Sequence, residues 1–118
     1  MRRNRPEQDI QRAVFEHIAI RGARECYAFH CPNGGWRSPI EAAIMRGLGV
    51  RAGIPDIIGI KAGHVFGLEL KAPGGRLSPV QREVHAALCA AGATVAVATG
   101  LDAALAQLEA WQLLRGHG

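Results

Sequence analysis

Long apolar runs are missing from this sequence, since none approaches the roughly 20 residues that a membrane-spanning helix needs. The basic start, residues 1–6, is not followed by the apolar core of a secretory signal. We therefore expect a cytoplasmic protein without a membrane partner. The 118 residues also contain no internal repeat, linker or low-complexity tract, so we expect one domain over residues 1–118.

Cysteine is scarce, and its three positions, Cys26, Cys31 and Cys89, cannot pair evenly. An odd number fits a reducing compartment, where buried thiols act as small hydrophobic groups. Cys26, His30 and Cys31 lie close together and suggest zinc, but their spacing matches none of the usual paired-ligand patterns. The sequence therefore favours cysteines of the core over a zinc site.

Lysine occurs only twice, and the other twelve of the fourteen basic residues are arginine, in a chain of formal net charge +4. The guanidinium group of arginine can donate two parallel hydrogen bonds to a phosphate, which points toward nucleic acid. A chain rich in Ala, Gly and Arg is also what GC-rich DNA encodes. Charge alone therefore supports a nucleic-acid partner only weakly.

Apolar spacing and capping residues predict the helices. Ile10, Val14 and Ile18 recur every four residues and predict one amphipathic helix. The segments 38–41 and 78–81 each contain serine, proline and then Glu or Gln three residues after the serine, which is typical of a capped helix start. The apolar positions expected on one side of the helix after residue 78 are Val80, Val84, Ala87 and Leu88.

Runs of β-branched and aromatic residues predict the strands. The two middle strands are joined by the short segment 62–64, which contains glycine and favours an antiparallel hairpin. The expected elements are helix 7–20, strand 24–31, helix 39–47, strands 56–61 and 65–71, helix 79–91, strand 94–98 and helix 102–114. This order predicts an α/β fold with a mixed four-stranded sheet flanked by helices.

Three charged residues interrupt the apolar strands: Asp56, Glu69 and Lys71. Successive side chains of a strand point to opposite faces, so Glu69 and Lys71 share a face. In a hairpin closed near Gly63, Asp56 comes within reach of the same face. Two carboxylates and one ammonium group can hold a divalent cation and a water molecule.

Magnesium prefers carboxylate oxygens and commonly takes one or two of them together with water and substrate phosphate. The metal lowers the pKa of bound water and offsets the charge that builds on the phosphate. A lysine beside it can orient or deprotonate that water. The alternative is a Glu69–Lys71 ion pair on an exposed face, with Asp56 capping a turn, and these residues alone do not decide between the two.

Glu7 and Gln81 are two further candidates. Glu7 falls on the apolar stripe of the first helix, so its carboxylate needs a partner such as a metal ion or a nearby arginine or lysine. Its alternative role is to complement the helix dipole. Gln81 can close a capping box with Ser78 or reach the active site as a hydrogen-bond donor.

A family resemblance emerges from these residues. Gly53-Ile-Pro-Asp56 followed by Glu69-Leu-Lys71 resembles the PD-(D/E)xK nuclease signature. Four surrounding segments make the likeness specific to the VRR-NUC family, the virus-type replication-repair nucleases. These segments are Pro6-Glu7-x-x-Ile10-Gln11, Asn33-Gly-Gly35, Gly47-Leu-Gly-Val-Arg-Ala-Gly-Ile-Pro-Asp56 and Leu68-Glu-Leu-Lys-Ala-Pro-Gly-Gly-Arg-Leu-Ser-Pro-Val-Gln81.

The resemblance implies a restriction-endonuclease-like fold and cleavage of DNA phosphodiester bonds with Mg²⁺ or Mn²⁺. It implies metal-binding acids at Glu7, Asp56 and Glu69, a catalytic lysine at Lys71 and a site glutamine at Gln81. The backbone carbonyl of Leu70 is expected to complete the metal ligands, and Glu7 to act directly or through water. Stand-alone relatives resemble phage and prophage proteins, and some of them act on branched DNA. We therefore expect branched or junction DNA as the substrate, in replication or repair.

Arginines near these motifs are the expected phosphate contacts, although each is as readily a solvated surface charge. They are Arg37, Arg46, Arg51 and Arg76. The rival function is a non-catalytic DNA-binding or assembly module that keeps the nuclease fold. A zinc-binding regulator is the third possibility, but the cysteine spacing does not offer tetrahedral ligands.

A homodimer is also expected, because some stand-alone relatives act as dimers on branched DNA and a chain of this size has little surface for gripping such a substrate. Residues 38–49 carry apolar side chains at helical spacing that could form the contact. These side chains are Ile40, Ile44, Met45 and Leu48. The alternative is that the segment packs on its own core.

Overall fold

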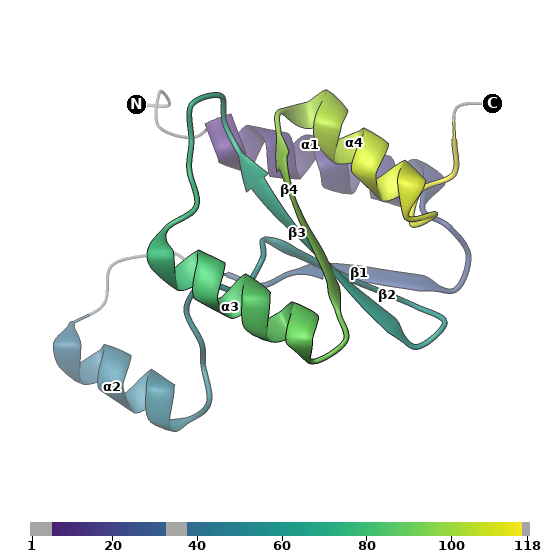
Figure 1. Ribbon diagram of the computed structural model, residues 1–118. Coiled ribbons are helices and arrows are strands. Elements are labelled where there is room, and N and C mark those ends of the chain that lie inside the picture. Colours follow the sequence, from purple (N-terminus) through teal and green to yellow (C-terminus); the bar gives the residue numbers. More distant parts are fainter. Residues whose placement is uncertain (1–5, 33–37, 117–118) are drawn as a thin grey trace.

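A computed structural model describes residues 6–32 and 38–116, and these contain eight elements in the expected order (Figure 1). The elements are α1 (Pro6–Arg21), β1 (Cys26–His30), α2 (Pro39–Gly47), β2 (Ile57–Lys61), β3 (His64–Lys71), α3 (Pro79–Ala90), β4 (Thr94–Thr99) and α4 (Leu101–Ala110). The expected bounds are confirmed to within two residues except at the end of α4. No helix of the described residues is long and apolar enough to span a membrane.

The expected helix over residues 102–114 is wrong at its C-terminal end, because α4 stops at Ala110. Gln112 has a left-handed backbone with φ of 63°, and the N–H of Leu113 donates to a carbonyl in the last turns of the helix over 2.9 Å. This reversal of the chain buries both Leu113 and Leu114. In a continued helix these neighbours would point in directions roughly 100° apart.

The sheet has the strand order β1-β2-β3-β4. β2 pairs antiparallel with both β1 and β3, whereas β3 and β4 are parallel and are connected through α3. The predicted mixed sheet is therefore confirmed. The predicted hairpin is confirmed as well. Lys61 pairs with His64, and the two residues between them, Ala62 and Gly63, have φ of 51° and 78°, the positive values of a tight hairpin turn.

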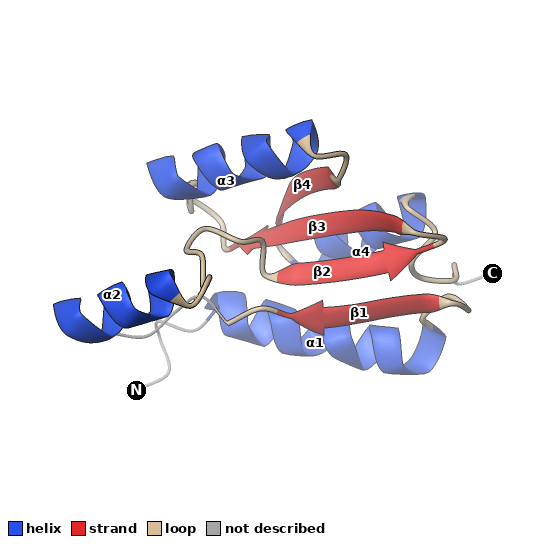
Figure 2. Ribbon diagram, turned by 90° about the horizontal axis from the view of Figure 1, so that it is seen from below, coloured by secondary structure: helices blue, strands red, loops and turns tan. Residues whose placement is uncertain are grey.

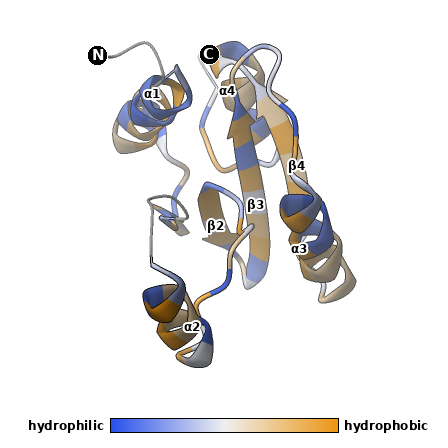
Figure 3. Ribbon diagram, turned by 90° about the vertical axis from the view of Figure 1, so that its left-hand side faces the viewer, coloured by the Kyte–Doolittle hydropathy of each residue, from blue (hydrophilic) through white to orange (hydrophobic). Residues whose placement is uncertain are grey.

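Helices α1 and α4 cover one face of the sheet, and α3 covers part of the other (Figure 2, Figure 3). The hydrophobic core lies between the sheet and the α1–α4 layer. Its buried members are Val14, Ile57, Leu68, Leu70, Ala98, Ala104, Leu105, Leu108, Leu113 and Leu114. Because Leu68 and Leu70 point into this core, Glu69 and Lys71 point to the opposite face, toward α3.

The apolar side predicted for α3 is wrong in part. Val80 is 49% exposed and Ala87 is also exposed, whereas His85 is the buried residue of this helix. The helix is turned so that Gln81 and His85, one turn apart, face the polar end of β3. The polar side chains of β3 therefore determine which side of α3 faces the sheet.

The expectation that the cysteines belong to the core is wrong for Cys89, which is exposed. Cys26 and Cys31 are half-buried. Cys26 packs against the core, and burial raises the pKa of its thiol. Within the described residues, these cysteines and His30 form no cluster that could hold a metal ion, so the structure offers no support for zinc.

The buried side chain of Arg21 joins the C-terminal end of α1 to α4. Its guanidinium group donates to Glu109 over 2.6 Å, to the carbonyl of Arg115 and to His17 over 3.1 Å. Because a buried charge is costly without partners, this network stabilises one relative position of the two helices.

We expect Arg21→Ala to lower the free energy of unfolding by about 1.5–3 kcal/mol, the usual contribution of hydrogen bonds to a charged group. Arg12→Ala is the matched control, because Arg12 is 70% exposed and pairs with Asp9 only at 3.6 Å, so its loss should cost about 0–1 kcal/mol. Urea unfolding measures both. Equal losses would contradict the stabilising role of the buried arginine.

Candidate active site

Asp56 lies directly before β2, and its carboxylate turns toward β3. Its Oδ2 atom accepts a hydrogen bond from the N–H of Leu70 over 2.8 Å. On the other side, its backbone carbonyl accepts from the N–H of Cys31 at 3.3 Å and lies 2.6 Å from Nδ1 of His30. Asp56 is therefore fixed between β1 and β3.

Two glycines allow the chain to bring Asp56 to this position. Gly53 has φ of 84°, and a Cβ atom there would lie 2.9 Å from the carbonyl oxygen of Val80 in α3. A Cβ atom on Gly67 would lie 2.9 Å from the ring of Pro55. The loop before β2 thus packs closely against both α3 and β3, and larger residues at these glycines would push it away.

Glu69 and Lys71 lie on the same face of β3, and both are buried, with 3% and 9% of the residue exposed. The alternative of an exposed ion pair is therefore wrong. Nζ of Lys71 lies 3.7 Å from Oε2 of Glu69 and donates to Oε1 of Gln81 over 3.1 Å. These two ionisable groups are thus held close together and are largely shielded from solvent.

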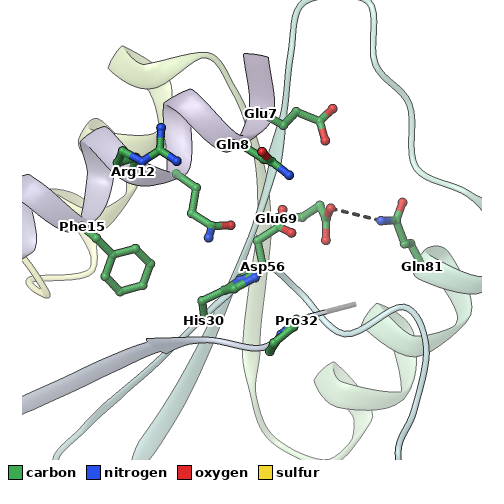
Figure 4. A pocket seen from close by; sticks show the side chains of 10 residues that line it. Glu7, Gln8, Arg12, Phe15, His30, Pro32, Asp56, Glu69 and Gln81 are labelled. Atoms are coloured by element: carbon green, nitrogen blue, oxygen red, sulfur yellow. Dashed lines mark hydrogen bonds between the residues drawn. The ribbon is translucent and has the colours of Figure 1, made fainter. Parts of the chain in front are cut away.

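Gln81 makes the contacts of both roles considered for it, helix cap and member of the site. Its Oε1 atom accepts from the N–H of Ser78 over 2.9 Å, which closes the capping box of α3. Its Nε2 atom donates to Oε2 of Glu69 over 3.1 Å (Figure 4). One side chain therefore caps the helix and connects it to the acidic group.

Glu7, in the first turn of α1, approaches the same end of the sheet. Its carboxylate accepts a hydrogen bond from the N–H of Ala72 over 3.2 Å. The partner in this structure is thus a backbone amide, not the arginine or lysine considered from the sequence. The charge of Glu7 still acts on Glu69, whose pKa it helps to raise.

His85 is a residue of the site that the sequence did not suggest. It is 8% exposed, and its Nε2 atom lies 3.6 Å from Oε1 of Glu69. Both of these atoms are buried without a hydrogen-bond partner among the described residues. Burial and the charge of Lys71 lower the pKa of His85, which favours the neutral ring. Its four-residue spacing from Gln81 could have revealed it.

The carboxyl group of Glu69 has a pKa raised to about 8. Burial is the largest cause, followed by the adjacent Asp56 carboxylate, while the charge of Lys71 opposes the shift. A cation placed against Oε1 would favour the ionised form, and that oxygen accepts no hydrogen bond from residues 6–32 and 38–116.

The donor set fits a hard divalent cation with few protein ligands. No group of three or more His, Cys, Asp or Glu side chains in the described part of the chain is arranged to hold a metal ion. Asp56 and Glu69 nevertheless provide two adjacent carboxylates, and magnesium commonly uses one or two together with water and phosphate. The residues therefore fit magnesium or manganese better than a fully protein-ligated metal such as structural zinc.

The acidic cluster opens into a cleft of about 830 Å³ between α1 and the ends of β1 and β2 (Figure 4). Its lining residues are Glu7, Gln8, Gln11, Arg12, Phe15, His30, Pro32, Asp56, Glu69 and Gln81. Arg12 and Phe15 were not identified from the sequence, and His30 was considered there only as a zinc ligand. The cleft has room for part of a substrate beside the acids.

The three described arginines that were expected to contact phosphate do not line this cleft. Arg46 in α2, Arg51 in the following loop and Arg76 between β3 and α3 are all exposed. Arg51 donates to the carbonyls of Arg46 and Val50 at 3.3 and 3.4 Å. Arg37 lies outside the described residues. Their contact with phosphate stays a prediction.

Comparisons with known proteins agree with the geometry. The family model described as VRR-NUC domain matches residues 7–102. A solved structure described as "VRR_NUC domain protein" superposes with a TM-score of 0.76 over 92% of this chain and 89% of the other, at 24% sequence identity. No curated protein matches the chain.

Glu69→Gln is expected to stabilise the metal-free protein at pH 8. The pKa of Glu69 is about 8 in the folded chain, above its ordinary value of 4.5. Between these pH values the unfolded chain loses the proton that the folded chain keeps, so the wild type loses stability as pH rises. Glutamine does not ionise. At pH 8 the free energy of unfolding of the variant should therefore exceed that of the wild type by at least about 1.4 kcal/mol, the equivalent of one pKa unit.

Urea unfolding in EDTA at pH 5 and pH 8 measures this difference. Glu83→Gln, an exposed change on the same helix, is the control and should leave the pH dependence of the wild type unaltered. A Glu69→Gln protein with the same loss of stability toward pH 8 as the wild type would show that Glu69 does not carry the shifted proton.

Proposed function

Because the chain belongs to the VRR-NUC family, which has a restriction-endonuclease-like fold, we propose that it is a DNA endonuclease that requires Mg²⁺ or Mn²⁺. The family establishes a nuclease-type domain. The finer proposal rests on the connected group of Asp56, Glu69, Lys71 and Gln81. Three of these residues, Asp56, Glu69 and Gln81, line an open cleft. Buried groups with shifted pKa values in a cleft are typical of catalytic sites.

The carboxylates of Asp56 and Glu69 would hold the metal ion together with the backbone carbonyl of Leu70. The N–H of Leu70 already points to Asp56, and the N–H and C=O groups of one strand residue point to the same side. Glu7 would contribute through water, since its carboxylate lies against the neighbouring backbone. When bound, the ion supplies positive charge beside the phosphate and lowers the pKa of a water molecule.

Lys71 is the group that would position the attacking water. Its ammonium group is held between Oε1 of Gln81 and Oε2 of Glu69, so it can turn only a little without losing a partner. A fixed donor of this kind orients a water molecule toward the phosphorus atom before the reaction begins. Gln81 acts through its two contacts, because it holds both Lys71 and Glu69 in place.

The DNA would enter through the cleft, with the exposed arginines in α2 and the adjoining loops reaching the backbone beyond it. Arg46, Arg51 and Arg76 are our candidates for these contacts, with Arg37 from outside the described residues. We propose branched or junction DNA as the substrate, in phage-type replication or repair.

We also propose that two copies of the chain associate through α2. This helix has no buried residue and stands away from the sheet (Figure 3). Its side chains Ile40 and Ile44 are 74% and 58% exposed, and Leu48 just after it is 79% exposed. On the sheet, the cross-strand neighbours Tyr27 and Ile60 are also exposed, by 71% and 38%. Clusters of exposed apolar side chains, such as the one on α2, are typical of association sites.

Cleavage of labelled branched, single-stranded and duplex DNA in Mg²⁺, Mn²⁺ or EDTA tests the enzyme directly. We expect metal-dependent strand scission by the wild type, reduced about 10²-fold or more in Lys71→Met, which keeps the apolar stem and removes the charge. Lys61→Met is the matched control. The ammonium group of Lys61 donates to the carbonyl of Gln112 and does not line the cleft, so its loss should leave turnover unchanged. DNA binding without scission in any metal would favour a non-catalytic module.

Sedimentation at micromolar concentration tests the association. Ile40→Asp should convert a dimer to a monomer, and the aspartate, in the first turn of α2, should not weaken the helix. Ile20→Asp introduces the same change at a residue of α1 that is 77% exposed and should leave the dimer intact. A monomeric wild type, or equal effects of the two changes, would rule out α2 as the interface.

A further inference from the structure

The cleft continues past the acids along α1, where the proposed reaction uses none of the lining residues. Gln8, Gln11, Arg12 and Phe15 line this part from the helix. His30, at the end of β1, lines the same cleft (Figure 4). We call the four α1 residues the α1 wall. Together they offer an aromatic ring, two amides and one guanidinium group.

Phe15 is the ring of the α1 wall. It packs against the hydrophobic core and is half-buried, so part of the ring remains accessible from the cleft. Phe15 follows Glu7 by eight residues of helix, which corresponds to about 12 Å along the axis. The ring therefore lies about two helical turns beyond Glu7 in the same cleft, where it can meet a nucleotide next to the phosphate held at the acids.

The polar groups of the α1 wall suit a nucleobase better than a run of phosphates. Each glutamine amide has a donor and an acceptor, as base edges do, whereas a phosphate only accepts. Among the described lining residues, Arg12 is the one arginine or lysine, beside the acids Glu7, Asp56 and Glu69. A backbone lying along the α1 wall would therefore find one cationic partner, and it would leave the amide acceptors and the ring unused. A base stacked on Phe15 would use all three kinds of group.

From this arrangement we propose that the α1 wall is a subsite for an unpaired nucleobase next to the scissile phosphate. The base stacks on Phe15, its edge bonds the amides of Gln8 and Gln11, and Arg12 meets the next phosphate. This subsite rests on the proposed nuclease function. A base inside a duplex is stacked on its neighbours and cannot reach the ring, so the subsite selects DNA that is frayed, single-stranded or branched at this point.

The test measures binding, so that it does not depend on cleavage. The probes are a blunt duplex and the same duplex with a single-stranded overhang that carries 2-aminopurine, whose fluorescence is quenched by stacking. Both are titrated with Lys71→Met protein in Mg²⁺, with and without Phe15→Leu. We expect Phe15→Leu to weaken overhang binding by about 5- to 150-fold, the equivalent of 1–3 kcal/mol of stacking per base, and to abolish the quenching.

Phe29→Leu is the matched control. Phe29 precedes the cleft residue His30 in β1, but its own ring does not line the cleft. It should change neither affinity nor quenching, and Phe15→Leu should leave blunt-duplex binding unchanged. Unaltered overhang binding in Phe15→Leu, or an equal loss for both DNAs, would overturn the subsite. A wild type that selects overhangs through Phe15 but cuts nothing would overturn the nuclease proposal alone.

Discussion

Burial of the Glu69 carboxylate is the constraint on which the arrangement of the site depends. Only 3% of this residue is exposed, and a charge in such a place is stable only with partners on every side. Lys71 approaches one oxygen from its own strand, Gln81 donates to the same oxygen from α3, and His85 faces the other. The position and rotation of α3 follow from these contacts.

The cost of this burial is what gives the site its capacity to bind a cation. With the Asp56 carboxylate beside it, Glu69 has a pKa near 8 in the absence of metal, so the folded chain holds a proton where a divalent ion would fit. A fold selected for stability alone would place an apolar residue here. The acids, the lysine and the capping glutamine are therefore most simply explained by function, and they stand at the edge of a core that is otherwise apolar.

Much of this fold could be predicted because its signals are local. Ser38 and Ser78 cap their helices as their spacing indicated, and the hairpin turn lies at Ala62 and Gly63. The rotation of α3 could not be predicted, because His85 faces Glu69 through a tertiary contact that helical periodicity does not contain. The end of α4 was misplaced for a similar reason, since burial of Leu113 and Leu114 against the core overrides helix propensity.

The site likewise combines residues that the sequence predicted with features that depend on tertiary contacts. Asp56, Glu69 and Lys71 were found from their unusual place in apolar strands and from their resemblance to a family signature. The burial of the Glu69–Lys71 pair depends on α3, and the accessible side of Phe15 depends on where α1 lies relative to β1. Neither follows from the spacing of residues along the chain.

If Asp56 and Glu69 hold a catalytic divalent ion, anomalous diffraction from crystals grown with Mn²⁺ will locate it. We expect one peak per chain between the two carboxylates, with the carbonyl of Leu70 as a third protein ligand at about 2.1 Å, close to the magnesium distance. Manganese bound only elsewhere, or no peak at these residues under conditions in which the protein cuts DNA, would contradict it.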